Sequence, residues 1–225
     1  MVETPLVKIR PPLVNQNLSG QIYQILRENI ITGKYFPGMK IQEEDLSKEL
    51  GVSRTPIRES LNLLEKNGLI KVLPRKGNYV IRLTRQEIIE IFDVREGLEG
   101  IAANLAAQRM TMEYLKRIKK SLESRLDKVK RFDFGPYYPP DLDFHKILIE
   151  TCGNQKLMDC LMSIWDQFLT LRLSSASHKG RAKESVKEHM EIYRMLEKRD
   201  SEGAERSMRR HIRNAKDNLL LHYLY

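Results

Sequence analysis

Two arginines, Arg54 and Arg58, stand four residues apart just after Gly51. Residues at this spacing lie on one face of a helix, so both guanidinium groups would project from the same side. A guanidinium can donate two hydrogen bonds to guanine O6 and N7 in the major groove of DNA. The nearby hydroxyls of Ser53 and Thr55 suit phosphate oxygens, which position a protein without reading sequence. The pattern predicts a helix that enters the major groove.

A second set of residues has side chains that bind metal ions. Asp141 and His145 are four apart and would point the same way from one helix, and His189 and His211 belong to later helical stretches. One carboxylate and three imidazoles are a credible ligand set for Zn²⁺, Ni²⁺ or Mn²⁺. Spacing alone leaves another interpretation open, because a helical histidine is more often a core or surface residue, and Asp143 could replace Asp141 on a solvated face.

The elements that would position the arginines form a helix-turn-helix. Residues 43–50 predict a short helix whose acidic first turn suits the helix dipole. Gly51 permits a tight reversal, and Ser53 is a natural N-cap for the second helix. Pro56 is tolerated in the first turn of that helix, where no amide bond is lost. The inward stripe of the second helix consists of Ile57, Leu61 and Leu64.

Further elements surround this pair of helices. An amphipathic helix precedes it and stops at Gly33, and Gly68 ends the second helix as a C′ glycine. Two strand-like runs, 69–72 and 78–81, flank the basic turn at 74–77. Such a basic hairpin is the wing of a winged helix. The apolar side of the preceding helix contains Ile22, Ile25, Leu26, Asn29 and Ile30.

The charge of the chain agrees with a nucleic-acid partner. The 225 residues carry a net charge of +9. Residues 1–82 hold 13 Lys/Arg and 8 Asp/Glu, whereas residues 83–225 hold 26 and 22. The positive excess is therefore denser in the smaller segment, as contact with phosphates requires. Helix-turn-helix shapes occur in other proteins too, but the arginine pair and the basic hairpin together favour DNA.

The cysteines and the apolar runs both favour an intracellular protein. Cys152 and Cys160 are eight residues apart in a helical region, which is roughly 12 Å along a helix and too far for a disulfide. They are interpreted as reduced thiols. No apolar run approaches the length of a membrane span, and the N-terminus lacks a signal-peptide core. We therefore expect a cytoplasmic protein with no membrane partner.

After Ile81 the periodicity becomes helical and stays so to the C-terminus. Thr84 and Glu87 form a capping box that opens a long helix. Later helices are predicted at 112–130, 140–152, 155–175, 182–199 and 202–222. We predict a mainly α protein with three parts. These are a flexible arm (1–17), a winged helix-turn-helix with three helices and a β-hairpin wing (18–82), and an all-α antiparallel bundle of about six helices (83–225).

The residues quoted so far, with a few others, match the motifs of a known family. In the N-terminal part these are Gly33, Pro37-Gly38, Leu46-Ser47, the run from Leu50 to Glu59, Leu61, Leu64, Asn67-Gly68-Leu69 and Gly77. In the C-terminal part they are Val94-Arg95, Leu98-Glu99, the run from Asp141 to His145, Gly153-Asn154, Glu188-His189 and His211. Over about residues 18–222 the chain resembles GntR-family bacterial transcription regulators of the FadR subfamily, in the version whose FCD effector domain binds a metal.

The resemblance implies roles for individual residues. The residues that would contact operator DNA are Ser53, Arg54, Thr55 and Arg58, with Lys76 and Gly77 placing the wing tip at the minor groove. The residues that would hold a divalent metal are Asp141, His145, His189 and His211. One position departs from the family. Glu44 stands where some relatives carry a DNA-contacting arginine, so that contact should be absent here.

The expected function is that of a ligand-responsive regulator, with repression as the expected mode. A homodimer would read two half-sites about one helical turn apart, and the larger helical domain would supply its interface. A small organic acid bound at the metal would shift DNA affinity. Arg95 could give that acid a bidentate contact, or it could pair with Glu99 four residues later. Arg172 is a second candidate for the acid.

Two other function classes compete with this one. A metal with an open position could activate water, which would make the protein a metal-dependent hydrolase with an accessory DNA-binding domain. No general base is evident near the four ligands, since the unassigned His178 and His222 both look exposed. An architectural DNA-binding protein would have no use for the Asp/His set. We therefore expect a regulator and not an enzyme.

Overall fold

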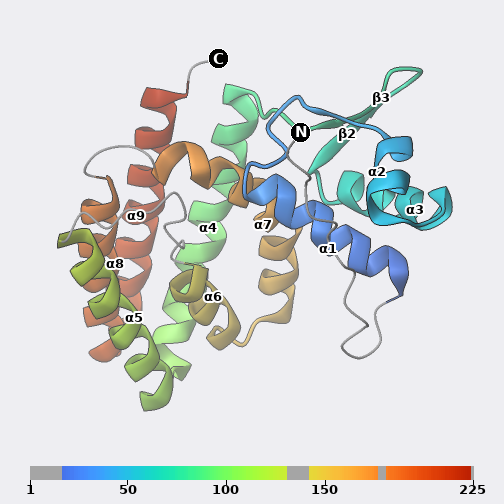
Figure 1. The fold of residues 1–225 in the computed structure, drawn as a ribbon. Coiled ribbons are helices and arrows are strands. Elements are labelled where there is room, and N and C mark those ends of the chain that lie inside the picture. The colour runs from blue at the N-terminus through green and yellow to red at the C-terminus, as the bar shows by residue number, and fades with distance from the viewer. Residues whose placement is uncertain (1–16, 131–141, 177–180, 224–225) are drawn as a thin grey trace. The chain divides into compact units, whose positions relative to one another are not determined.

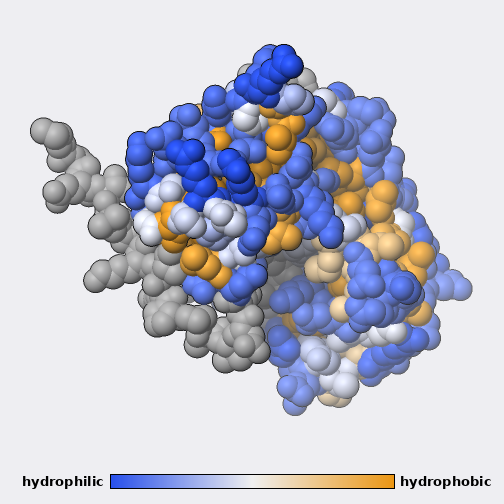
Figure 2. Space-filling model, turned by 90° about the vertical axis from the view of Figure 1, so that its right-hand side faces the viewer, coloured by the Kyte–Doolittle hydropathy of each residue, from blue (hydrophilic) through white to orange (hydrophobic). Residues whose placement is uncertain are grey.

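A computed structural model describes residues 17–130, 142–176 and 181–223. The chain divides into two compact units. The first comprises residues 1–82 with 166–173, and the second comprises residues 83–165 with 174–225. In the described ranges no helix combines the length and the apolar character of a membrane span. Hydrophilic residues cover most of the face seen in Figure 2, with small hydrophobic groups between them, in keeping with a mean hydropathy of −0.48.

The first unit is a winged helix-turn-helix. Its three helices, α1 (Leu18–Ile31), α2 (Glu43–Leu50) and α3 (Arg54–Lys66), surround a common core (Figure 1). The inward stripe predicted for α3 is buried in that core, and α1 contributes an i, i+4 stripe of its own. These core residues are Ile22, Leu26, Ile30, Ile57, Leu61 and Leu64.

A small antiparallel sheet completes this unit. The hairpin strands β2 (Ile70–Leu73) and β3 (Gly77–Val80) confirm the predicted wing, although each is shifted by one residue from the expected bounds. A third strand, β1 (Lys40–Ile41), pairs with β3 on its other side, so the strand order is β1-β3-β2. We did not predict β1, because a strand of two residues carries no alternating pattern.

The turn between α2 and α3 is tight and well bonded. Gly51 has a φ of 65°, in the left-handed region that glycine adopts without strain, and its N–H donates to Ser47 O at 3.0 Å. The Ser47 hydroxyl donates to Val52 O at 2.6 Å. Ser53 takes the N-cap position of α3 with extended backbone, but its side chain makes no capping hydrogen bond. The N-cap position predicted for Ser53 is therefore confirmed, although no side-chain hydrogen bond accompanies it.

The second unit contains the helices predicted after residue 82. Its elements are α4 (Arg85–Arg109), α5 (Met112–Lys130), α6 (Leu142–Thr151), α7 (Gln155–Ala176), α8 (Arg181–Glu197) and α9 (Ser201–His222). The middle of α7, Asp166–Leu173, is grouped with the first unit. Thr84 and Glu87 make both hydrogen bonds of the predicted capping box at the start of α4.

The packing of these helices decides which side chains can meet. α4 lies antiparallel to α9, since Arg85 bonds Leu220 O at one end and Asn104 bonds Glu205 toward the other. Buried alanines on α4 leave room for close approach of its neighbours. α8 packs against both α9 and α5, and α6 packs against α4 and α5. The inner faces of α6, α8 and α9 can therefore share one interior site.

Candidate DNA-binding surface and metal centre

The first turns of α3 present the predicted DNA-binding residues to solvent. The side chains of Arg54 and Arg58 are more than half exposed. Ser53 and Thr55 are exposed beside them. The α3 helix therefore offers two guanidinium groups and two hydroxyls on a surface that a DNA duplex can reach.

Two carboxylates from the first turn of α2 lie next to these arginines. Arg58 Nε donates a hydrogen bond to Glu43 Oε2 at 2.8 Å. Arg54 Nη2 lies 3.8 Å from Glu44 Oε2, and the other oxygen of Glu44, Oε1, lies 3.4 Å from Lys48 Nζ. From the sequence we attributed the acidic turn to the helix dipole alone. Its proximity to α3 follows from the tight turn between the two helices.

The wing tip carries the other two predicted DNA-binding residues. Lys76 is exposed, and its backbone N–H closes the turn by donating to Leu73 O at 3.0 Å. Gly77 begins β3 with a φ of 105°, a conformation that residues with a Cβ rarely adopt. A longer side chain at this position would strain the hairpin that presents the Lys76 ammonium group.

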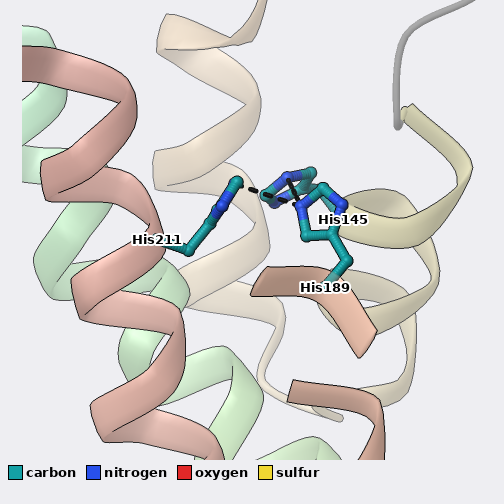
Figure 3. Close-up of side chains that lie close together, drawn as sticks. All are labelled: His145, His189 and His211. Carbon is teal, nitrogen blue, oxygen red and sulfur yellow. Dashed lines mark hydrogen bonds between the residues drawn. The ribbon is translucent and has the colours of Figure 1, made fainter. Parts of the chain in front are cut away.

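Three helices of the second unit bring His145, His189 and His211 together in a buried cluster (Figure 3). The rings come from α6, α8 and α9, respectively. His189 Nε2 lies 3.2 Å from His145 Nε2 and 3.1 Å from His211 Nε2. These three residues, far apart in the sequence, thus place their Nε2 atoms around a common point.

The geometry of the cluster fits a divalent metal. Metal–nitrogen bonds of about 2.0–2.1 Å place two ligand atoms about 3.0–3.4 Å apart, depending on coordination geometry. The two Nε2 separations around His189 fall within this range. Three imidazole nitrogens facing one another in a buried space need a proton or a cation between them. Neutral imidazoles also suit Zn²⁺ and Ni²⁺ as ligands.

Two carboxylates fix the orientation of two of the rings. Glu99 Oε2 accepts from His145 Nδ1 at 2.5 Å, and Glu188 Oε2 accepts from His211 Nδ1 at 2.6 Å. Because an ionised carboxylate can only accept, the proton lies on Nδ1 and the Nε2 lone pair points into the cluster. Metal-binding histidines commonly have such a partner. Sequence reasoning did not give this role to either carboxylate.

Glu99 is held ionised by an arginine on its own helix. Arg95 Nε donates to Glu99 Oε1 at 2.7 Å, and both side chains are buried. Burial alone would raise the pKa of Glu99, but the charges and hydrogen bonds of Arg95 and His145 outweigh it and hold the pKa at about 2. The predicted pairing of Arg95 with Glu99 is thus present, whereas a contact of Arg95 with an acid stays a prediction.

Glu188 has a more elaborate set of partners. Arg181 donates to its two oxygens at 3.0 and 2.8 Å, and Asn214 Nδ2 donates to Oε1 at 2.8 Å. Burial would raise the pKa of Glu188, but His211 and Arg181 lower it to about 2. Glu188 therefore stays negatively charged and keeps His211 in the orientation that the cluster requires.

Two of the three imidazoles, those of His145 and His211, are neutral near pH 7. Burial lowers the pKa of His145, and Glu99 only partly opposes this effect. Burial and the nearby His189 lower the pKa of His211 to about 4. A neutral imidazole is the form that binds metal, so the cluster has no bound proton to displace from these two nitrogens at neutral pH.

The structure does not describe several of the predicted residues, and another, His222, lies outside the cluster. Asp141 and His178 lie outside the described residues, as do positions 1–16 of the predicted arm, and the side chain of Arg172 is not described. His222 is exposed, and its Nδ1 is 2.8 Å from Asn218 O one turn earlier on α9. The fourth metal ligand therefore stays a prediction, based on the spacing of Asp141 from His145 and on the resemblance.

The comparisons with known proteins match both units. Residues 18–80 match the family described as bacterial regulatory proteins, gntR family, and residues 90–214 match the FCD domain. The chain belongs to the GntR family of bacterial transcriptional regulators and carries an FCD domain. This confirms the fold predicted from the sequence, namely a winged helix-turn-helix followed by a helical effector-type domain.

Individual relatives agree with this assignment. The HTH-type transcriptional repressor RspR of Escherichia coli (strain K12) is 28% identical over 218 residues, which are 97% of this chain and 93% of that protein. The uncharacterized HTH-type transcriptional regulator YdhC of Bacillus subtilis (strain 168) is 30% identical over 200 residues, 88% of this chain and 89% of that one. The solved structure of E. coli McbR/YncC shares the fold, with a TM-score of 0.79 and 21% identity over 93% of this chain and 100% of its own.

These families and relatives are transcriptional regulators, as expected, rather than enzymes. The alternative of a metal-dependent hydrolase gains no support from them.

Proposed function

We propose that this GntR-family regulator is a repressor whose affinity for operator DNA is controlled by a small carboxylate at a divalent metal centre in the FCD domain. The convergence of three buried imidazoles, two of them oriented by ionised carboxylates, carries the proposal. The mode of action is taken from RspR, which is named a repressor.

The metal would be held by His145, His189 and His211, with Asp141 as the fourth ligand by resemblance. A bound Zn²⁺, Ni²⁺ or Mn²⁺ supplies a Lewis-acidic position that can accept a carboxylate oxygen. The protein contributes neutral imidazoles, fixed ring orientations and a buried setting. Arg95 is linked to the cluster through Glu99, which bonds both Arg95 and His145. Its guanidinium would give a bidentate contact to an acid bound at the metal.

The DNA-reading part would be the surface formed by Ser53, Arg54, Thr55 and Arg58, with Lys76 and Gly77 at the wing. One such helix reads only a few base pairs, so a homodimer that reads two half-sites supplies the remaining specificity. An acid that binds one arrangement of the protein better than another shifts the DNA affinity by that difference. Release from the operator is the outcome that we expect when the acid binds.

The test compares the full-length wild type with His189→Ala and with His222→Ala, an exposed histidine as control. Each protein is stripped with chelator, reloaded with Zn²⁺, Ni²⁺ or Mn²⁺, and analysed for metal content. We expect one metal per chain in the wild type and the control, and none in His189→Ala. In a thermal-shift screen, small carboxylates should then stabilise only the loaded proteins. Full occupancy of His189→Ala would contradict the metal site.

A thermal shift that does not depend on the metal would contradict the proposed route of the acid. The same loaded proteins can be titrated against duplex DNA with and without the stabilising acid. Weaker DNA binding in the presence of the acid is the expected result for a repressor that is released by its effector. Tighter binding would contradict repression by the free protein.

A further inference from the structure

Glu43 and Arg58 form the one hydrogen-bonded ion pair recorded between α2 and the exposed face of α3 in the described residues. We infer that Glu43 is a positioning residue, which holds the Arg58 guanidinium in the orientation that reads a base and thereby sets the sequence selectivity of this surface. The inference rests on the proposed DNA contact of Arg58, and it adds a residue that reads no base itself.

The geometry of the pair suits this role. Glu43 accepts from Nε, the nitrogen nearest the arginine stem, at 2.8 Å. The two hydrogen bonds to guanine O6 and N7 can come from the terminal nitrogens of the same fork. A carboxylate on Nε therefore holds the plane of the guanidinium without occupying the end that meets the base.

The exposure of the Arg58 side chain explains why a positioning partner matters. The Arg58 side chain is 65% exposed, whereas that of Glu43 is 27% exposed. A long exposed arginine samples many rotamers, and fixing it on DNA costs conformational entropy. A partner that fixes the side chain before binding removes part of that cost. It also restrains Arg58 from turning toward a phosphate, which carries no sequence information.

The carboxylate has an opposite effect on general affinity. A negative charge beside the recognition helix repels DNA phosphates whatever their sequence. Glu43 should therefore lower affinity for every duplex while raising the preference for the correct one. These two effects have different signatures, so they can be measured separately.

A purely structural explanation exists for the acidic turn. Glu43, Glu44 and Asp45 all lie where the helix dipole of α2 favours negative charge. That explanation predicts equal effects of neighbouring acids. Their contacts differ, however. Glu44 is 60% exposed and lies 3.8 Å from Arg54, beyond hydrogen-bond distance. Glu44 is therefore a matched control, with the same charge in the same turn.

The experiment uses full-length protein and two duplexes. One is the sequence that the wild type enriches from a random-sequence pool, and the other is a shuffled duplex of equal length and composition. Dissociation constants are measured at one salt concentration for the wild type, Glu43→Gln and Glu44→Gln. We expect Glu44→Gln to tighten binding of both duplexes by a similar factor. Glu43→Gln should lower the ratio of the two affinities by about fivefold or more.

A second comparison tests whether Glu43 acts through Arg58. In an Arg58→Ala background, Glu43→Gln should cause no further loss of the ratio, because the group it positions is gone. An equal loss of the ratio in Glu43→Gln and Glu44→Gln, or no loss in Glu43→Gln, would overturn the inference. A wild type that enriches no duplex would contradict the proposed function itself. Thermal melting of each variant checks that α2 remains folded.

Discussion

The proposed DNA-binding surface and the histidine cluster each contain an ion pair of the same kind, in which an arginine donates through Nε to a glutamate. On the surface, Arg58 bonds Glu43 at 2.8 Å, with the two side chains 65% and 27% exposed. Beside the cluster, Arg95 bonds Glu99 at 2.7 Å, with the side chains 2% and 1% exposed. The two pairs have the same donor and acceptor groups and nearly equal distances, so burial is the main difference between them.

Because of this difference in burial, the two pairs contribute differently to the stability of the fold. Water screens the exposed pair, which contributes about 0–1 kcal/mol to the stability of the fold. The buried pair cannot be separated without leaving a charge in a low-dielectric interior, which costs about 3–5 kcal/mol. The surface pair can therefore orient Arg58 with little effect on the fold, whereas the buried pair is needed both for the fold and for the fixed orientation of His145.

The largest expected effect comes from breaking the buried pair. Glu99→Ala leaves Arg95 without its glutamate in the core and should lower the free energy of unfolding by about 3–5 kcal/mol. Urea denaturation measures this change. Asp93→Ala serves as control, because Asp93 lies on α4 with Glu99 but pairs at the surface with Lys216 of α9, and its loss should cost about 0–1 kcal/mol. Similar losses of unfolding free energy in both variants would contradict the expected difference between the buried pair and the exposed pair.

The next effect concerns the carboxylate of Glu188, which is half-buried beside His211. Glu188→Gln weakens the acceptor that holds His211, so metal affinity should fall about 10–100-fold while the three imidazoles remain. Competition with a chelator measures the affinity. Glu184→Gln, on the same helix but in an exposed pair with Lys187, should leave it unchanged. Equal metal affinities for the two variants would mean that Glu188 does not orient a ligand.

On the surface, Arg58→Ala should weaken binding of the enriched duplex at least about tenfold, because it removes a base-reading fork. Binding of the shuffled duplex should fall less, since that interaction is mostly with phosphates. Arg210→Ala provides the control, as an exposed arginine of the second unit. Unchanged binding of the enriched duplex in a mobility-shift titration would exclude Arg58 from recognition.

The features that the sequence predicted well have local causes. The i, i+4 stripe of α3, the glycine turn at Gly51 and the capping box at Thr84 each depend on residues within one or two turns. Strand β1 was missed because its existence depends on pairing with Tyr79 and Asn78, almost forty positions away. Ser53 was predicted correctly as the N-cap of α3, but residue type alone does not show whether its hydroxyl makes the usual capping hydrogen bond, which the structure lacks.

The histidine cluster shows a different limit of prediction from the sequence. His145, His189 and His211 lie on three helices, and no periodicity connects positions separated by 44 and 22 residues. The ligand chemistry of these residue types suggested the set, and the family resemblance supported it, but neither could show that the three rings meet. The carboxylates at Glu99 and Glu188 could not be assigned to particular rings, because that assignment depends on how α4 packs against α6 and α8 against α9.

The smallest expected effect lies at the wing. Lys76 is exposed at the hairpin tip, and an ammonium group that contacts a phosphate contributes attraction without selectivity. Lys76→Ala should therefore weaken binding of the enriched and shuffled duplexes by the same factor and reduce the slope of log affinity against log salt by about 1. Lys119→Ala, an exposed lysine of α5, should change neither value. An unchanged slope would show that Lys76 does not contact a DNA phosphate. A loss of affinity confined to the enriched duplex would mean that Lys76 reads a base, the role proposed here for Arg58.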